Sequence, residues 1–306
     1  MEKNVLDALF LSVGAMKAGT TWLCERLKDH PEISFTPEKE IHYFAHQNGI
    51  FDLLSQENRV KKFFNFFEAQ NGFDLQFFLK QTTEIEWYAR YASATDLEDS
   101  WYQWLFSFKA PQAKYCADFC NLNSQLDASG WRHVRRNCRT LRVVYTLRDP
   151  FERAWSHFKF HMETINREEE IKDNFAYFKE LCEQPWFWQF ALYDEAIERL
   201  KQSLAPEELM IVYFEDFRSH ETKTLNELCQ FLDISPKGLA PSPTDKKVNP
   251  SLDIPIPSEF AEYLHERVSP IYHSLRRMGY GHPAWEQYKG AFGFSAERPS
   301  TTAEAA

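Results

Sequence analysis

The stretch Ala8-Leu9-Phe10-Leu11-Ser12-Val13-Gly14-Ala15-Met16-Lys17-Ala18-Gly19-Thr20-Thr21-Trp22-Leu23 decides the interpretation of this 306-residue chain. It opens with a largely apolar run that stops at Gly14, as a buried parallel strand does. From Thr20 to Asp29 the apolar residues recur at helical spacing, and His30-Pro31 ends the pattern. The sequence therefore predicts a strand, a glycine-containing loop and a helix in succession.

The loop between the predicted strand and helix has the composition of a phosphate-binding loop. Gly14 and Gly19 let the backbone wrap around an anion, so that N–H groups and the helix N-terminus point at its oxygens. A nucleotide triphosphatase loop has a lysine directly after the second glycine, whereas this chain has Thr20 there and Lys17 inside the loop. A lysine in that place would offset charge on a departing phosphate group. The alternative is a tight turn without a ligand, which the glycines, lysine and threonines together disfavour.

The same strand-to-helix pattern recurs twice. Residues 141–147 form a second apolar run that ends at Arg148-Asp149-Pro150, with a helical pattern behind it. Residues 209–214 form a third run, followed by Glu215-Asp216 and another helical pattern. This alternation predicts an α/β fold, with a P-loop-like, doubly wound parallel sheet flanked by helices in a single domain.

The chain divides into one domain over residues 1–290 and a tail over 291–306 that we expect to be disordered. Residues 51–110 are rich in Phe and Trp, and we expect a helical insertion on the acceptor side. Taken singly, each of these aromatic residues is better explained as core. The proline-rich stretch 236–257 is expected to be an extended surface loop that leads into a final helix over about 258–278.

Composition excludes several classes of function. The formal net charge is −10, which argues against non-specific nucleic-acid binding. The chain has no run of 18 apolar residues and no basic segment at its start, so we expect neither a membrane span nor a secretory signal. The six cysteines are expected to be reduced thiols, and Cys116 and Cys120 lack further ligands at zinc spacing. These features predict a cytoplasmic protein without a metal site.

A second anion-binding motif follows the strand at 141–147. Arg148 stands at the carboxyl end of that strand and Ser156 about two helical turns later. A forked guanidinium and a short hydroxyl can converge on one phosphate, at the edge where open α/β sheets bind ligands. Alone, Arg148 would better be explained as a partner in a surface ion pair, for example with Asp149. The phosphate loop and this motif, however, occur in the right order and on the right elements. Together they favour phosphate binding by Arg148 over an ion pair.

The two motifs resemble those of the sulfotransferase family. Lys17-Ala18-Gly19-Thr20-Thr21-Trp22-Leu23 looks like the loop that binds the 5′-phosphosulfate of 3′-phosphoadenosine 5′-phosphosulfate. The segment 148–158 is similar to the family's 3′-phosphate motif, R-x-P-x-x-R-x-x-S. The resemblance implies that the donor and its product, 3′-phosphoadenosine 5′-phosphate, are held without a metal. The residues implied are Lys17, Ala18, Gly19, Thr20, Thr21 and Trp22 at the 5′ end, and Arg148 and Ser156 at the 3′ end.

Transfer to a hydroxyl also needs a base, and Glu38-Lys39-Glu40-Ile41-His42-Tyr43-Phe44 offers one. In an extended segment Glu40 and His42 would face the same side. The segment looks like the K-E-x-H-x-F stretch of carbohydrate-modifying and bacterial sulfotransferases, which implies Glu40 as the base and His42 as runner-up or orienting partner. The alternative is a solvated charge run. His133 and His157 are weaker candidates for the same role.

The resemblance is weaker at two further segments. Relatives carry G-D-x-[ST]-P-x-Y where this chain has Ala117-Asp118-Phe119-Cys120-Asn121, which puts an acceptor-site role for Asp118 in doubt. Residues 244–249 look like the loop that covers the donor. In that case Lys246, Lys247 or Asn249 reach the 3′-phosphate, although a solvated loop explains the segment equally well.

The sequence thus predicts a sulfotransferase that acts on the hydroxyl or amine of a small-molecule or carbohydrate acceptor. It leaves the acceptor, and the number of subunits, open. The rival predictions are a P-loop kinase or nucleotide triphosphatase that uses magnesium and ATP, and a non-catalytic nucleotide-binding protein. The missing lysine after Gly19 disfavours the first rival. The intact Lys17, Arg148, Ser156 and Glu40 disfavour the second.

Overall fold

Five parallel strands form one sheet at the centre of the protein. The computed structural model describes residues 5–69, 79, 81–239 and 252–288, and the structural statements below concern these residues. The strand order is β2-β3-β1-β4-β5. The strands span β1 Leu6–Ser12, β2 Ile33–Phe35, β3 Tyr115–Phe119, β4 Cys138–Leu147 and β5 Leu209–Tyr213.

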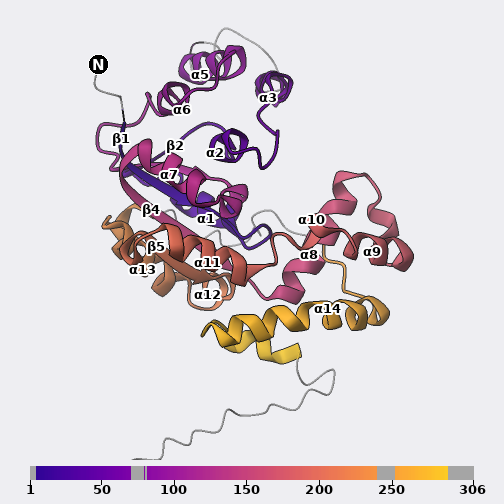
Figure 1. The fold of residues 1–306 in the computed structure, drawn as a ribbon. Coiled ribbons are helices and arrows are strands. Elements are labelled where there is room, and N and C mark those ends of the chain that lie inside the picture. Colours follow the sequence, from indigo (N-terminus) through magenta and orange to yellow (C-terminus); the bar gives the residue numbers. More distant parts are fainter. Residues whose placement is uncertain (1–4, 70–78, 80, 240–251, 289–306) are drawn as a thin grey trace, which may run out of the picture.

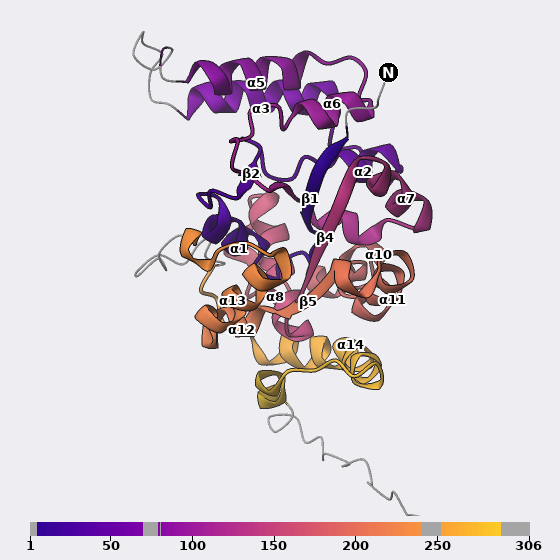
Figure 2. The same cartoon turned by 90° about the vertical axis from the view of Figure 1, so that its left-hand side faces the viewer.

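Helices cover both faces of this sheet (Figures 1 and 2). The α-helices of the described residues are α1 Thr20–Leu27, α2 Tyr43–Gln47, α3 Gln56–Glu68, α5 Thr82–Ser93, α6 Asp99–Trp104, α7 Ala128–Arg136, α8 Pro150–Thr164, α9 Phe175–Cys182, α10 Pro185–Trp188, α11 Tyr193–Ser203, α12 Phe214–Ser219, α13 Glu221–Leu232 and α14 Ser258–Arg277. Short 3₁₀ turns lie at Asn121–Gln125, Glu168–Glu170, Pro206–Glu208, Pro236–Gly238 and Pro283–Tyr288. The doubly wound parallel sheet predicted from the sequence is therefore confirmed.

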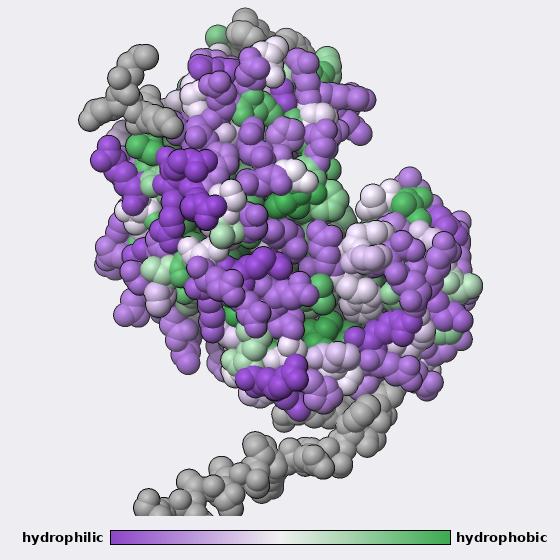
Figure 3. Space-filling view, viewed as in Figure 1, coloured by the Kyte–Doolittle hydropathy of each residue, from purple (hydrophilic) through white to green (hydrophobic). Residues whose placement is uncertain are grey.

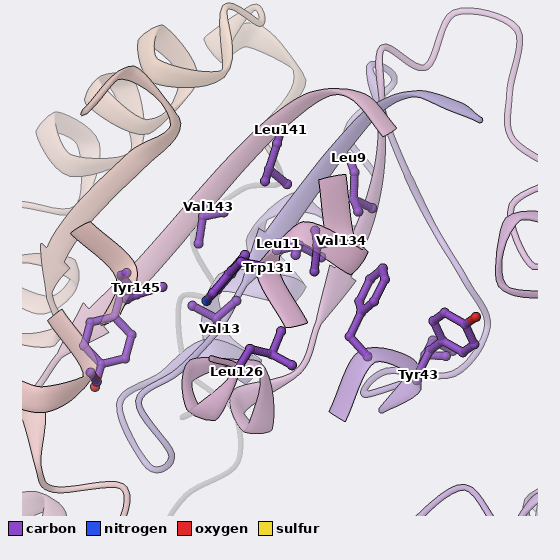
Figure 4. Close-up of a cluster of buried hydrophobic side chains, with 14 of the residues drawn as sticks. Leu9, Leu11, Val13, Tyr43, Leu126, Trp131, Val134, Leu141, Val143 and Tyr145 are labelled. Atoms are coloured by element: carbon purple, nitrogen blue, oxygen red, sulfur yellow. The ribbon is translucent and has the colours of Figure 1, made fainter. Parts of the chain in front are cut away.

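Alternation along β1 separates two hydrophobic cores. Leu9 and Leu11 point to the face covered by α2, α5, α6, α7 and α11, where they pack with Trp131 and Val143 (Figure 4). Phe10 points to the opposite face, covered by α1, α12 and α13. A third core lies where α8, α9 and α14 pack together beyond the carboxyl ends of the strands. A strand that is buried on both faces has a continuous apolar sequence, and this made β1 and β4 recognisable as strands from the sequence.

The structure corrects the sequence-based elements at several places. β2 and β3 were not predicted as strands, because β2 has only three residues and β3 carries the polar Asp118. Phe214 starts α12 and does not extend β5. The aromatic stretch holds the helices α3, α5 and α6, and Trp87 and Trp101 are core residues. The expected tail lies outside the described residues, as does most of the proline-rich loop.

Two expectations from composition can be compared with the structure. All six cysteines are free thiols, as predicted. Among the described helices, none has the length and apolar character needed to cross a membrane.

Candidate functional site

The glycine-containing loop joins β1 to α1 and is anchored on the end of β4. The Ala15 N–H donates to the carbonyl of Thr146 at 2.8 Å, and the Thr146 N–H donates to the carbonyl of Gly14 at 2.7 Å. Gly14, Lys17 and Gly19 have φ values of 118°, 65° and 83°. Gly19 caps α1 without a side-chain hydrogen bond to the first turn. The first N–H groups of α1 are thus without a side-chain cap, as an anion-binding helix N-terminus requires.

Gly19 meets two constraints at once. Its φ of +83° disfavours any other residue, and an added Cβ would lie 2.5 Å from Cδ2 of Phe214. Gly279 has nearly the same φ, +81°, but open space around it. We expect Gly19→Ala to lower the free energy of unfolding by about 1–3 kcal/mol more than Gly279→Ala does, since only the first adds a steric clash. Equilibrium urea unfolding of both variants measures the difference, and equal losses would contradict the argument.

Arg148 lies against the phosphate loop. It follows the last residue of β4, which pairs with β1, and its Nη1 donates to the carbonyl oxygen of Lys17 at 2.8 Å. Its guanidinium stacks 4.7 Å from the ring centroid of Phe214 and pairs with Glu152 at 3.5 Å. Arg148 Nε is buried without a hydrogen-bond partner among the described residues. The two predicted anion-binding motifs therefore meet at one place.

Three cationic side chains gather around this place. The ammonium of Lys17 lies 4.3 Å from the ring centroid of Phe160 on α8. Burial lowers the pKa of Lys17, Glu163 raises it, and the positive charges of Arg148 and Lys159 lower it further. Burial also lowers the pKa of Lys159, whose ammonium donates to the carbonyl of Leu252 at 2.6 Å. These cations repel one another, so a bound anion would stabilise all three. Because the whole chain has a net charge of −10, this positive region is local.

The helix α8 presents several residues to this site. Asp149 caps it by accepting from the N–H groups of Phe151 and Glu152, and Pro150 occupies its first position. Ser156 is buried and stands one turn before Lys159 and Phe160, so these three residues share a helix face. Lys159 was not predicted from the sequence, although its spacing from Ser156 was visible there.

The remaining predicted donor residues differ in their surroundings. Ala18 and Thr20 are buried at the start of α1, and Thr21 is half-buried. Trp22 is half-buried, and its ring packs on that of Phe217 with 4.9 Å between the centroids. The segment with Lys246, Lys247 and Asn249 lies outside the described residues.

The segment around Glu40 contacts the residues that follow the phosphate loop. The ammonium of Lys39 donates to Thr21 Oγ1 at 3.0 Å and lies 3.6 Å from Glu40 Oε1. Glu40 Oε2 lies 3.7 Å from His42 Nε2. The segment is not extended, as had been expected: Glu40 and His42 both have left-handed backbones, with φ of 65° and 62°. Their side chains lie close together because the chain turns there, and not because residues alternate along a strand.

The electrostatics of this turn set Glu40 apart from His42. Burial raises the pKa of Glu40, and the charges of Lys39 and Lys62 oppose that shift. Burial lowers the pKa of His42 to about 4, so its imidazole is neutral near pH 7. Glu38 is held by Lys62 at 2.7 Å and by the Tyr88 hydroxyl at 2.8 Å. The acidic run is therefore half-buried and paired, which contradicts its interpretation as a solvated surface.

The two weaker histidine candidates, His157 and His133, each pack against other side chains. His157 is buried and stacks on Phe187 at 4.8 Å, and burial, reinforced by Arg153, lowers its pKa to about 2. His133 Nε2 lies 2.6 Å from Asp99, which also accepts from the Tyr43 hydroxyl at 2.9 Å. His157 is thus held in a stack of rings, and His133 in a hydrogen-bond network around Asp99.

Sequence reasoning missed Lys39 and Phe214. Lys39 was visible only as part of a charge run, because its contact with Thr21 is tertiary. Phe214 gave no signal, because it lies between Gly19 and Arg148 only once β5 is in the sheet. Within the described ranges, no three His, Cys, Asp or Glu side chains gather as metal ligands would.

The surface of the molecule is hollowed between two groups of helices (Figure 3). Figure 3 shows a hollow between the part of the molecule that carries α2, α3 and α5 and the part that carries α8, α9 and α10, with hydrophobic residues along it. Phe160 on α8 and Trp186 on α10 keep 41% and 39% of their surface exposed. The exposed ring of Phe160 is the one that the Lys17 ammonium approaches at 4.3 Å.

Comparisons with known proteins agree on one family. Residues 10–237 match the sequence profile described as the sulfotransferase family. A sulfotransferase from Alicyclobacillus acidocaldarius has a similar structure, with 19% identity, a TM-score of 0.61, and 92% of this chain and 100% of that chain covered. The sulfotransferase domain from the curacin biosynthetic pathway gives 16% identity, a TM-score of 0.53, and coverage of 92% and 100%.

A third similar structure is the sulfotransferase domain from the olefin synthase of Synechococcus PCC 7002. It gives 15% identity, a TM-score of 0.52, and coverage of 92% of this chain and 98% of that chain. A search of curated proteins gave no match. At such identities the structural likeness concerns the fold alone, and the sequence profile carries the family.

Proposed function

Because the chain belongs to the sulfotransferase family, we propose that it transfers a sulfuryl group from 3′-phosphoadenosine 5′-phosphosulfate to an acceptor. The acceptor is a small molecule or a carbohydrate with a hydroxyl or an amine. The observation that carries the proposal is the hydrogen bond from Arg148 Nη1 to the carbonyl of Lys17, at 2.8 Å. It unites the two anion-binding motifs, as a nucleotide with phosphates at both its 3′ and 5′ positions requires.

The residues of the site fit such a donor in charge and in hydrogen-bonding capacity. Lys17, Arg148 and Lys159 supply positive charge, and each is at least partly withdrawn from water. Arg148 Nε is a buried donor without a partner among the described residues. The uncapped N-terminus of α1 adds backbone N–H groups. These groups together offset the charges of a bisphosphate without help from a metal.

Each residue has one task in the proposed transfer. Thr20, Thr21 and the loop N–H groups hold the 5′-phosphosulfate, and Arg148 with Ser156 holds the 3′-phosphate. The acceptor oxygen or nitrogen forms a new bond to sulfur while the bond from sulfur to the bridging oxygen breaks. Glu40 takes the proton of the acceptor, and His42 orients Glu40. Lys17 offsets the negative charge that develops on the bridging oxygen.

Three further features belong to the proposal. Lys246, Lys247 or Asn249 binds the 3′-phosphate of the donor. Residues 1–290 act as one domain, with 51–110 on the acceptor side. The protein works in the cytoplasm, in keeping with its six free thiols.

The deciding experiment is an acceptor screen with donor labelled with ³⁵S on the sulfuryl group. We expect the label to move to an acceptor that carries an aromatic ring or a sugar, without added magnesium. Magnesium-dependent transfer from ATP would support the kinase alternative and overturn the proposal. Donor binding without transfer to any acceptor of a broad panel would favour a non-catalytic nucleotide-binding protein.

A further inference from the structure

His42 is in contact with the thiol of Cys120, a residue for which the proposed transfer gives no task. The distance from Cys120 Sγ to His42 Nδ1 is 3.3 Å, which is within the range of a hydrogen bond that involves sulfur. The other ring nitrogen of His42, Nε2, lies 3.7 Å from Glu40 Oε2. That separation exceeds a hydrogen bond, but a contact of this kind often shortens when the substrate binds. The imidazole therefore lies between a thiol and the carboxylate of the proposed base.

The main chain fixes Cys120 where its thiol meets the imidazole. Cys120 directly follows β3, and its N–H donates to the carbonyl oxygen of Ser12, the last residue of β1, at 3.0 Å. Its side chain is fully buried in a small core with Ala45 and Leu122, against which Met16 of the phosphate loop packs. The sheet thus sets the position of the thiol, and the thiol cannot turn away to water.

Both partners of this contact are neutral near pH 7. Burial lowers the pKa of the His42 imidazole to about 4. Burial also raises the pKa of the Cys120 thiol well above that of an ordinary cysteine. The ionisable groups whose charges act on the pair lie on several elements, and they are Lys39, Glu40, Lys62 on α3 and Asp118 on β3. The contact therefore holds one proton, which is either on the sulfur or on Nδ1.

The Glu40 carboxylate decides between these two arrangements. A neutral imidazole has one N–H, and its other nitrogen is an acceptor. If the thiol donates to Nδ1, the ring proton is on Nε2 and is directed at the Glu40 carboxylate. If Nδ1 donates to the sulfur, the lone pair of Nε2 faces that carboxylate and repels it. The first arrangement satisfies both neighbours of the ring, so it is the one that the contacts favour.

We infer that Cys120 is a positioning residue for the base: its thiol donates to His42 Nδ1, and this keeps the Nε2–H of the imidazole directed at Glu40. The inference deepens the proposed function and rests on it, since Glu40 is the base only if the chain transfers a sulfuryl group. Cys120 is fully buried, so it acts through His42 and does not touch the acceptor. The Nε2–H in turn stabilises the charged form of Glu40 and favours one orientation of its carboxylate.

The test removes the thiol and then restores a donor. We expect Cys120→Ala to lower kcat about 5- to 10-fold, the effect of losing one hydrogen bond. Cys120→Ser keeps an O–H donor on the same Cβ and should stay within about threefold of wild type. The matched control is Cys116→Ala, at a position on β3 that is 1% exposed, and it should keep wild-type kcat. Wild-type kcat in Cys120→Ala would overturn the inference, and so would a Cys120→Ser protein as slow as Cys120→Ala.

The pH profile separates this role from a loss of packing. Without the Nε2–H directed at it, the Glu40 carboxylate loses a group that stabilises its charge, so its pKa rises. The acid limb of kcat/KM should therefore move to higher pH in Cys120→Ala and stay in place in Cys120→Ser and Cys116→Ala. An unmoved acid limb in Cys120→Ala would show that the thiol only fills space, and the inference would be wrong.

A second variant covers the case in which Cys120→Ala fails to fold. Cys120 has an extended backbone, with φ of −133° and ψ of 109°, which a β-branched residue adopts readily. Cys120→Val therefore fills the space of the thiol without supplying a donor. It should show the same loss of kcat and the same shift of the acid limb, and wild-type behaviour in Cys120→Val would overturn the inference.

The tautomer of His42 gives a readout that does not depend on activity. The ¹⁵N chemical shifts of labelled histidine distinguish a protonated ring nitrogen from an unprotonated one, and the His42→Gln variant assigns the signal. We expect the Nε2–H tautomer in wild type and in Cys120→Ser, and its partial or complete loss in Cys120→Ala. A wild-type proton on Nδ1 would overturn the inference even if sulfuryl transfer is established. The expected tautomers in a protein that transfers nothing would support the contact between thiol and imidazole and overturn the proposed function.

Discussion

Replacing Lys17 by alanine is expected to lower kcat about 10³-fold while the protein stays folded. The Lys17 ammonium lies beside Phe160 in a site where burial and neighbouring cations lower its pKa. A charge in such surroundings stabilises the leaving bisphosphate far more than it would in water. Steady-state transfer of ³⁵S label under saturating donor measures the effect, and thermal unfolding monitors the fold.

Two comparison variants show whether this loss belongs to the chemical step. Lys223→Ala removes a well-exposed lysine, whose side chain keeps 75% of its surface, and it should leave kcat unchanged. Arg148→Ala should chiefly raise KM for the donor, by about 10- to 100-fold, because it removes a charge-assisted hydrogen bond. A Lys17→Ala protein with wild-type turnover would remove Lys17 from the reaction.

Replacing Glu40 by glutamine is expected to lower kcat about 10²- to 10³-fold, with little change in donor affinity. Glutamine keeps the size of the side chain but cannot accept the proton of the acceptor. The matched control is Glu57→Gln, at an exposed position in the first turn of α3, which should behave as wild type. Initial rates at saturating donor and acceptor, together with binding of 3′-phosphoadenosine 5′-phosphate, separate the two effects.

The pH dependence identifies the base. A base acts in its deprotonated form, so kcat/KM should rise with pH as Glu40 loses its proton. Because burial raises the pKa of Glu40, the midpoint should lie above the ordinary glutamate value of 4.5. The pKa of His42 is lowered to about 4, so a midpoint near that value would indicate the histidine. Full activity and an intact acid limb in Glu40→Gln would pass the role to His42 or another group.

The amino-acid sequence by itself determined the doubly wound sheet and the meeting of Lys17 and Arg148 at its edge. β1 and β4 are buried on both faces, so their apolar runs are continuous and local. Gly14 lies close behind β1, Gly19 ends the loop at the start of α1, and Arg148 directly follows β4. Parallel strands expose their carboxyl ends at one edge, so local patterns sufficed to predict that Lys17 and Arg148 would meet.

Only the tertiary structure decided how the base is presented. The sequence of residues 38–44 suggested an extended segment, but two left-handed residues make it a turn. Side chains of this turn contact residues far from it in the sequence: Lys39 contacts Thr21, and His42 contacts Cys120 just after β3. Backbone conformations of this kind carry no periodic signal, because they are imposed by partners distant in sequence and not by the residues themselves. The arrangement of Glu40 and His42 therefore could not be predicted from the sequence, because it depends on the packing of β3 beside β1.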